Sequence, residues 1–170
     1  MAGPTQSRAT GRSTHITAAG AEALRRELDW LWRVKRPEVT QAVADAAALG
    51  DRSENAEYIY GKKQLREIDR RIRYLSKRLD EVTVVHDTPA DTRRIYFGAW
   101  FELETESGEA RRYRIVGSDE IDTGRGWISL DSPMAKAVLR KAVGDDVVVQ
   151  TPRGKQIFAV TAIWYHDPDG

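Results

Sequence analysis

The order of apolar and polar positions changes near residue 87 of the chain. Before that point apolar side chains recur at helical spacing, and after it short apolar runs alternate with turn residues. The pattern predicts a helical region over residues 14–86, a linker over 87–94 and a small α+β domain over 95–168. Residues 1–13 are rich in Gly, Ser, Thr and Arg without an apolar core, which predicts a disordered tail rather than a secretory signal peptide.

The first predicted helix begins at Thr17, because threonine commonly caps helix N-termini. Pro37 interrupts it, which predicts either a kink or a new segment with the proline at its first position. Gly50 then marks the end of the helix. The apolar stripe on both sides of the proline consists of Leu24, Leu28, Leu31, Val39, Val43 and Ala46.

The second predicted helix carries a heptad seam, with apolar positions at alternating intervals of three and four residues. No glycine or proline interrupts it between Lys62 and Asp87. Only a short link around residues 50–53 joins the two helices, which predicts an antiparallel coiled-coil hairpin with its tip at residues 50–58. A leg of about 30 residues makes a rod roughly 45 Å long. The seam residues are Leu65, Ile68, Ile72, Leu75, Leu79 and Val82.

The sequence beyond the linker predicts strands separated by turns, together with one short helix. Ser132 followed by Pro133 is typical of a helix N-terminus and predicts a helix through residues 134–140. The last two strands are joined by a turn at residues 151–154 and form a closing hairpin. The predicted strands are residues 95–103, 112–116, 127–130, 147–150 and 157–164.

The composition excludes several kinds of site. The chain of 170 residues has no cysteine, which excludes disulfides, thiolate zinc sites and cysteine nucleophiles and suits a reducing cytoplasm. The three histidines are far apart, so no pair has metal-ligand spacing. No apolar run approaches the ~18 residues that a membrane helix needs. We therefore expect a cytoplasmic protein.

The net charge of +1 conceals an uneven distribution of 27 basic and 26 acidic residues. Residues 62–86 carry eight basic and four acidic side chains, whereas residues 51–60 and 90–170 each have a net charge of −2. The basic stretch is either the solvated exterior of a coiled coil with local ion pairs or a surface for nucleic acid. Its basic residues are Lys62, Lys63, Arg66, Arg70, Arg71, Arg73, Lys77 and Arg78.

Asp51 and Glu54 stand in the acidic tip and admit two interpretations. They resemble a capping box at a helix N-terminus, where Ser53 is another candidate cap. Alternatively, they supply carboxylates to Mg²⁺ whose remaining ligands belong to another molecule, because the end of a thin rod offers no second wall. In two-metal phosphodiester hydrolysis, one metal ion activates water and the other stabilises the leaving oxygen.

Residues 50–58 have the sequence GDRSENAEY, and several further motifs are dispersed along the chain. In their sequence and order they resemble the bacterial Gre transcript-cleavage factors of the GreB type, with residues 50–58 matching the tip motif. The resemblance covers about residues 14–166, nearly the whole chain. The other matching segments are 32–33, 36–40, 62–63, 65–71, 97–100, 114–117, 119–120 and 131–135.

The resemblance implies a transcription elongation factor in which an FKBP-like α+β domain follows the hairpin and docks on RNA polymerase. Factors of this kind insert the coiled coil into the secondary channel of the polymerase and stimulate cleavage of the 3′ end of backtracked RNA, which rescues arrested complexes. By resemblance, Asp51 and Glu54 are the catalytic tip carboxylates and share Mg²⁺ only in the complex with polymerase. Asp131, Ser132 and Pro133 are the candidate docking residues. The implied basic patch for RNA is Lys62, Lys63, Arg66, Arg70, Arg71 and Arg73.

The resemblance further implies that the protein is not an enzyme alone and has no cofactor of its own. RNA polymerase and the nascent RNA 3′ end are the expected partners of a monomer that needs no membrane. One alternative is a secondary-channel regulator that modulates or inhibits the polymerase without cleavage; the presence of both tip acids favours cleavage. Another is a stand-alone isomerase or binding domain with a coiled-coil appendage.

Overall fold

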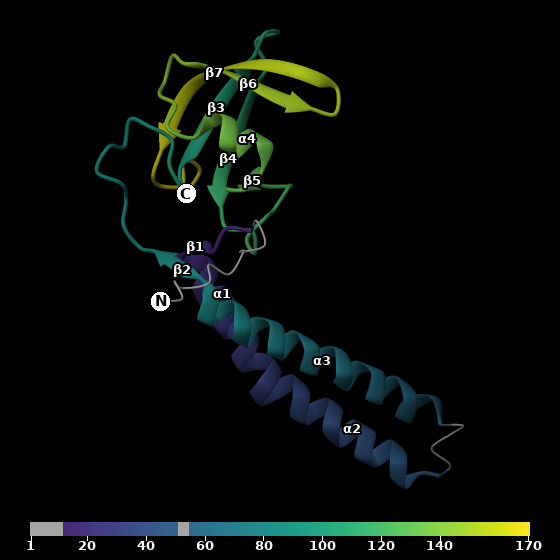
Figure 1. The fold of residues 1–170 in the computed structure, drawn as a ribbon. Coiled ribbons are helices and arrows are strands. Elements are labelled where there is room, and N and C mark those ends of the chain that lie inside the picture. Colours follow the sequence, from purple (N-terminus) through teal and green to yellow (C-terminus); the bar gives the residue numbers. More distant parts are fainter. Residues whose placement is uncertain (1–11, 51–54) are drawn as a thin grey trace, which may run out of the picture. The chain divides into compact units, whose positions relative to one another are not determined.

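The computed structural model describes residues 12–50 and 55–170, which form two compact units (Figure 1). The helical unit is Ala19–Val82. The second unit combines the described residues before Ala19 with Thr83–Gly170. The predicted α+β class, a helical hairpin followed by a small α+β domain, is confirmed. The predicted tail at residues 1–11 lies outside the described residues.

The first leg of the hairpin consists of α1 (Ala18–Trp30), a π-helical segment η1 (Leu31–Lys35) and α2 (Arg36–Ala48). The widened π turn ends at Lys35, two residues before Pro37. Proline lacks an N–H, and its ring disturbs an α-helical ladder. The proline lies in the first turn of α2. Of the two predicted outcomes, a kink or a new helical segment, the structure therefore shows the second.

The second leg is one continuous helix, α3 (Ala56–Glu81), which packs against α2 (Figure 1). All six residues of the predicted seam are buried or partly buried. The two helices approach closely at Gly61, because a Cβ added there would lie 2.7 Å from Cγ2 of Val43.

The second helix ends earlier than the sequence predicted. Thr83–Val85 form strand β2, which pairs in parallel with β1 (His15–Thr17). Three successive β-branched residues favour a strand over a helix at this point. Thr17 directly precedes α1, as predicted, but it is the last residue of β1.

Residues 12–17 are held by hydrogen bonds to other residues of the second unit, so the prediction of a disordered tail over 1–13 is wrong for Arg12 and Ser13. The Arg12 side chain donates to Ser118 at 2.7 Å, and the Ser13 amide donates to Asp131 at 2.7 Å. The Glu120 carboxylate accepts from the backbone amide of Thr17 at 3.0 Å.

The second unit is built on a five-stranded sheet of order β5-β4-β3-β7-β6, antiparallel except for the β4–β5 pair. Helix α4 (Pro133–Val138) contributes Ala135 and Val138 to the core, which lies on the sheet face that carries Phe101, Ile115 and Phe158. The strands are β3 (Trp100–Thr105), β4 (Ala110–Val116), β5 (Trp127–Ser129), β6 (Asp146–Thr151) and β7 (Gly154–Trp164).

Strand β3 begins five residues later than predicted, at Trp100 rather than at Ile95. Gly98 has a φ of +87°, which breaks the extended conformation before β3. Ile95 instead exchanges backbone hydrogen bonds with Arg140 and Lys141. The predicted linker, residues 87–94, forms no strand in the described structure, and its one strand-like pairing there is an isolated bridge from Arg94 to Ala142.

No helix of the described residues is long and apolar enough to cross a membrane.

Candidate nucleic-acid interface and hairpin tip

The tip of the hairpin joins α2 to α3, and its residues 51–54 lie outside the described residues. The predicted site residues Asp51 and Glu54 are therefore placed by the sequence alone, between the C-terminal end of α2 and the N-terminal end of α3. Within residues 12–50 and 55–170, no three His, Asp or Glu side chains are grouped so as to hold a metal ion.

The N-cap of α3 is Asn55, whose side-chain oxygen accepts a hydrogen bond from the Tyr58 amide at 3.1 Å. The residues of the capping interpretation, Asp51, Ser53 and Glu54, lie outside the described residues, and the described N-cap of α3 is Asn55. The Asn55 side-chain amide also donates to the Ala46 carbonyl of α2 at 2.6 Å. One residue thus caps α3 and ties together the two helices that frame the tip. Sequence reasoning missed it, although asparagine is a preferred N-cap type.

The outer face of α3 carries a stripe of exposed basic residues. Their intervals of three and four residues match those of the seam, and they lie on the opposite side of the helix from it. We call them the basic stripe: Lys63, Arg66, Arg70, Arg73 and Lys77. At 1.5 Å per residue the stripe runs along roughly 20 Å of helix.

Most of this charge is not neutralised within the described chain. Lys77 lies 3.8 Å from Glu81, but no ion pair within residues 12–50 and 55–170 involves the four other members of the basic stripe. Free cationic side chains in a row along one helix face attract phosphate groups. Local ion pairs within the described chain therefore do not account for Lys63, Arg66, Arg70 and Arg73.

The remaining predicted patch residues are placed differently. Arg71 makes a bidentate ion pair with Glu27 of α1, with N–O distances of 2.7 and 2.9 Å. Arg36 of the first leg pairs with Asp69 of α3 at 2.8 Å. These pairs link the two legs, so Arg71 has a structural partner that the stripe residues lack. Lys62 is partly buried and lies beside the seam.

Large apolar side chains next to the tip are exposed. Leu49 is 79% exposed, Ile59 52% and Tyr60 68%. Ile59 stands four residues before Lys63 and continues the line of the basic stripe towards the tip. Exposed apolar side chains gathered at one end of an element are typical of a contact surface. In the sequence, these residues are recognisable as apolar positions outside the heptad seam.

Asp131, Ser132 and Pro133 lie at the start of α4 in the second unit. The Ser132 hydroxyl accepts from the Ala135 amide at 3.1 Å and is the N-cap of α4, with Pro133 in the first turn. The Asp131 carboxylate accepts from the Ser13 amide. Helix capping therefore accounts for Ser132, and Pro133 is the most exposed of the three residues.

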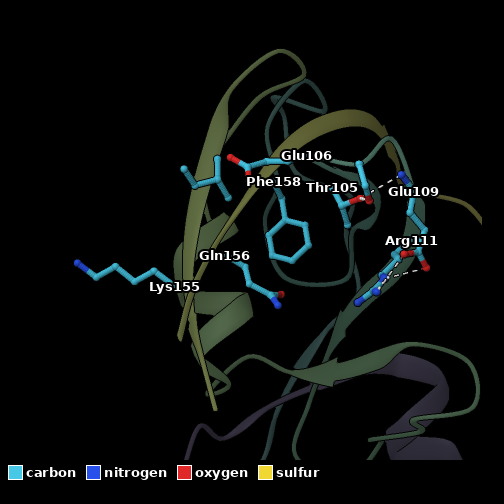
Figure 2. A pocket seen from close by; sticks show the side chains of 9 residues that line it. Thr105, Glu106, Glu109, Arg111, Lys155, Gln156 and Phe158 are labelled. Carbon is cyan, nitrogen blue, oxygen red and sulfur yellow. Dashed lines mark hydrogen bonds and ion pairs between the residues drawn. The ribbon is translucent and has the colours of Figure 1, made fainter. Parts of the chain in front are cut away.

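The second unit has a hollow of about 350 Å³ at the β3–β4 turn (Figure 2). Figure 2 shows Arg111 directed towards Glu109, with which it forms an ion pair at 3.2 Å. The hydrogen bond that Arg111 donates to the Glu109 carboxylate raises the pKa of Arg111 above its usual value. The guanidinium of Arg111 therefore already has a carboxylate partner in this hollow.

Comparison with known proteins gives consistent matches along the chain. Residues 14–84 match a family described as "Transcription elongation factor, N-terminal", and residues 90–165 match "Transcription elongation factor, GreA/GreB, C-term". Transcription elongation factor GreB of Haemophilus ducreyi is 56% identical over 154 residues, which are 91% of this chain and 95% of that protein. GreB of Pseudomonas aeruginosa is 59% identical over 150 residues, covering 88% and 89% of the two chains.

Solved structures also align with the chain. The crystal structure of GreA factor homolog 1 of Thermus thermophilus is 30% identical, covers 90% of this chain and 99% of that chain, and has a TM-score of 0.40. A GreA/GreB elongation factor from Nitrosomonas europaea is 17% identical, with coverage of 90% and 98% and a TM-score of 0.41.

Proposed function

Because the chain belongs to the GreA/GreB family of transcription elongation factors, we propose that it acts by binding RNA polymerase. In this proposal the hairpin enters the secondary channel of the polymerase. There it stimulates endonucleolytic cleavage of the 3′ end of backtracked RNA, so that arrested complexes resume elongation. The protein is not an enzyme alone, since the hydrolysis belongs to the polymerase. It acts as a monomer on RNA polymerase and the nascent RNA 3′ end.

The observation that carries the proposal is the basic stripe on the outer face of α3. Arg66, Arg70 and Arg73 are exposed, lie on one face and have no ion-pair partner in the described chain. The seam on the other face is occupied by the first leg, so the stripe can meet RNA without opening the hairpin. Such an interface suits an extruded RNA segment that lies along the outside of the hairpin.

The tip carboxylates Asp51 and Glu54 are proposed to supply oxygen ligands at the active site of the polymerase. Carboxylates are the ligand type that Mg²⁺ takes in proteins, usually one or two per ion with several waters. Bound Mg²⁺ supplies water activation and stabilisation of the leaving oxygen. The role of this chain is to deliver the two carboxylates on a narrow support that Asn55 braces between α2 and α3.

Docking of the second unit on the polymerase is proposed to involve Asp131, Ser132 and Pro133. Pro133 is exposed, and the hydrogen bonds of Ser132 and Asp131 hold the backbone before α4 in a fixed conformation. A preformed loop loses little conformational entropy on binding.

The basic stripe is tested by comparing two charge-matched double variants. Arg70→Ala/Arg73→Ala removes two stripe residues, and Arg25→Ala/Arg26→Ala removes two exposed arginines of α1. Only the first pair should reduce cleavage of backtracked complexes with long extruded RNA. It should also lower the slope of log affinity against log salt concentration by about 1.4, since each phosphate contact to a single strand contributes about 0.7. Arg71 is left intact because its loss would also remove the ion pair with Glu27.

Equal cleavage and equal salt slopes in the two double variants would refute the role of the stripe. The same assay separates the proposal from its alternative, a channel-binding regulator without cleavage. If the wild-type protein binds the stalled complex and slows it without shortening the RNA, the alternative holds.

A further inference from the structure

A row of tryptophan and arginine side chains crosses the outer face of the sheet in the second unit. Trp127, Arg114, Trp100 and Trp164 occupy directly paired positions on β5, β4, β3 and β7. Paired residues share one face of a sheet, and the neighbouring row, which contains Phe101, faces the core. The row therefore lies on the face opposite the core.

The aromatic rings hold the guanidinium groups of this face in fixed positions. The guanidinium carbon of Arg114 lies 3.7 Å from the ring centroid of Trp100 and 4.9 Å from that of Trp127. Cation–π contacts of this kind order a side chain before any ligand binds. We call the whole group the Trp–Arg surface: Trp100, Arg112, Arg114, Arg125, Trp127 and Trp164, with Arg112 stacked on Trp164 and Arg125 on Trp127 at 5.1 Å.

The negative charges of Glu120 and Asp167 act on Arg114 without forming an ion pair with it. Nε of Arg114 donates to the Gly98 carbonyl at 3.3 Å, and no ion pair in the described part of the chain involves this arginine. Burial of the guanidinium lowers the pKa of Arg114. A half-buried cation gains free energy when an anion replaces the water it has lost. This position therefore favours an anionic ligand.

Residues 167–169 of the chain itself show which chemistry the surface accepts. The Asp169 carboxylate accepts a hydrogen bond from Nη1 of Arg112 at 2.7 Å. Asp167, Pro168 and Asp169 line an open pocket of about 450 Å³. The same pocket is lined by Trp100, Arg112, Arg125 and Trp127.

We propose that the Trp–Arg surface is a docking site for an acidic, proline-containing peptide segment of a partner protein. Residues 167–169 occupy part of this site in cis, and the partner segment displaces them. A peptide suits the surface better than RNA does, because Glu102 and Asp122 pair with Arg112 and Arg125 at 3.3 and 3.5 Å. These two carboxylates would repel a continuous phosphate backbone, whereas a peptide can place single carboxylates beside the arginines.

The site is distinct from the surfaces proposed for transcript cleavage. None of its residues belongs to the tip, to the basic stripe or to the segment before α4. Helix α4 itself contributes to the core on the other face of the sheet. Loss of peptide binding would therefore leave cleavage by the polymerase intact.

The test measures binding of a defined peptide to the full-length protein by tryptophan fluorescence. The probe is the acetylated and amidated peptide His-Asp-Pro-Asp-Gly, and His-Asn-Pro-Asn-Gly is its uncharged control. Trp30 and Trp32 of the hairpin, 49% and 59% exposed, are replaced by Phe in every variant, so that the signal comes from the Trp–Arg surface. The protein variant Asp167→Asn/Asp169→Asn removes the competing carboxylates without shortening the chain.

We expect the Asp167→Asn/Asp169→Asn variant to bind the acidic peptide about tenfold more tightly than the parent, because one charge-assisted hydrogen bond no longer competes. Adding Arg112→Ala/Arg125→Ala should cancel that gain, whereas Arg153→Ala/Lys155→Ala, in the β6–β7 hairpin, should leave it unchanged. Thermal unfolding checks that each variant is folded.

Three results would overturn the proposal. The first is equal affinity of the parent and the Asp167→Asn/Asp169→Asn variant for the acidic peptide. The second is equal binding of the acidic and uncharged peptides. The third is tighter binding of an oligouridylate RNA, lost with the same two arginines, which would assign the surface to nucleic acid. The first comparison uses only surface Asp-to-Asn changes, so it holds even if the arginine variants fail to fold.

Discussion

The brace that Asn55 makes at the hairpin tip predicts unequal effects of two substitutions at one position. Asn55→Ala removes both the N-cap of α3 and the hydrogen bond to the Ala46 carbonyl. Asn55→Asp keeps an oxygen that accepts from the Tyr58 amide but loses the donor to Ala46. Comparison of the two variants therefore separates the cap from the link between the helices.

The expected magnitudes follow from the two bonds. Loss of an N-cap costs about 1 kcal/mol, and loss of a hydrogen bond between neutral groups costs about 1 kcal/mol. Asn55→Ala should thus destabilise the end of the hairpin by about 2 kcal/mol, and Asn55→Asp by about 1 kcal/mol. Ser132→Ala is a matched control, because the Ser132 side chain caps α4 and bonds to no other helix among the described residues. It should cost about 1 kcal/mol in the second unit only.

Amide hydrogen exchange is the suitable assay, since it reports local opening in each unit separately. The Tyr58 amide is bonded to the Asn55 side chain, and the Ile59 amide is bonded to the Asn55 carbonyl at 3.1 Å. Exchange of both should accelerate about thirtyfold in Asn55→Ala and about fivefold in Asn55→Asp. Equal acceleration in the two variants would refute the cap, and no acceleration in Asn55→Asp would refute the link to Ala46.

Two further predictions concern the second unit. Gly126→Ala should destabilise this unit by about 3 kcal/mol in urea unfolding, because Gly126 has a φ of +73° and an added Cβ would lie 2.4 Å from the Arg112 carbonyl; an unchanged midpoint would contradict this close approach. Tyr165→Phe should cost about 1–2 kcal/mol, since the hydroxyl donates to the Arg94 carbonyl at 2.5 Å and accepts from the Tyr96 amide at 2.9 Å. Burial raises the pKa of Tyr165, so its contribution is present below the usual tyrosine pKa near ~10 and is lost as pH rises above it. The variant should lose less stability than the wild type between neutral and strongly alkaline pH, and parallel pH profiles would contradict this role.

The helical hairpin could be predicted from the sequence because its signals are local and periodic. The seam from Leu65 to Val82 is buried or partly buried at every position, and Pro37 marks the start of a new segment. The end of α3 could not be predicted from periodicity, because Val82 continues the seam. The strand at Thr83–Val85 depends on pairing with His15–Thr17, which lies far away in the sequence.

The sequence predicts which residues of the candidate interface are basic, but not which of their side chains form ion pairs. A count of basic residues treats Arg70 and Arg71 alike, yet Arg71 is paired with Glu27 and Arg70 is free of ion pairs in the described chain. That difference depends on the packing of the two legs. The Trp–Arg surface depends on strand register, which brings Trp100 beside Arg114 and could not be read from either segment alone.

The most direct measurement for the proposed function is RNA cleavage in stalled, backtracked polymerase complexes with Asp51→Asn and Glu54→Gln variants. These substitutions remove the negative charges and keep the size of the side chains. The account predicts that both variants bind the polymerase as the wild type does, in a competition assay, and that both lose stimulated cleavage. Full cleavage by both variants would contradict the account.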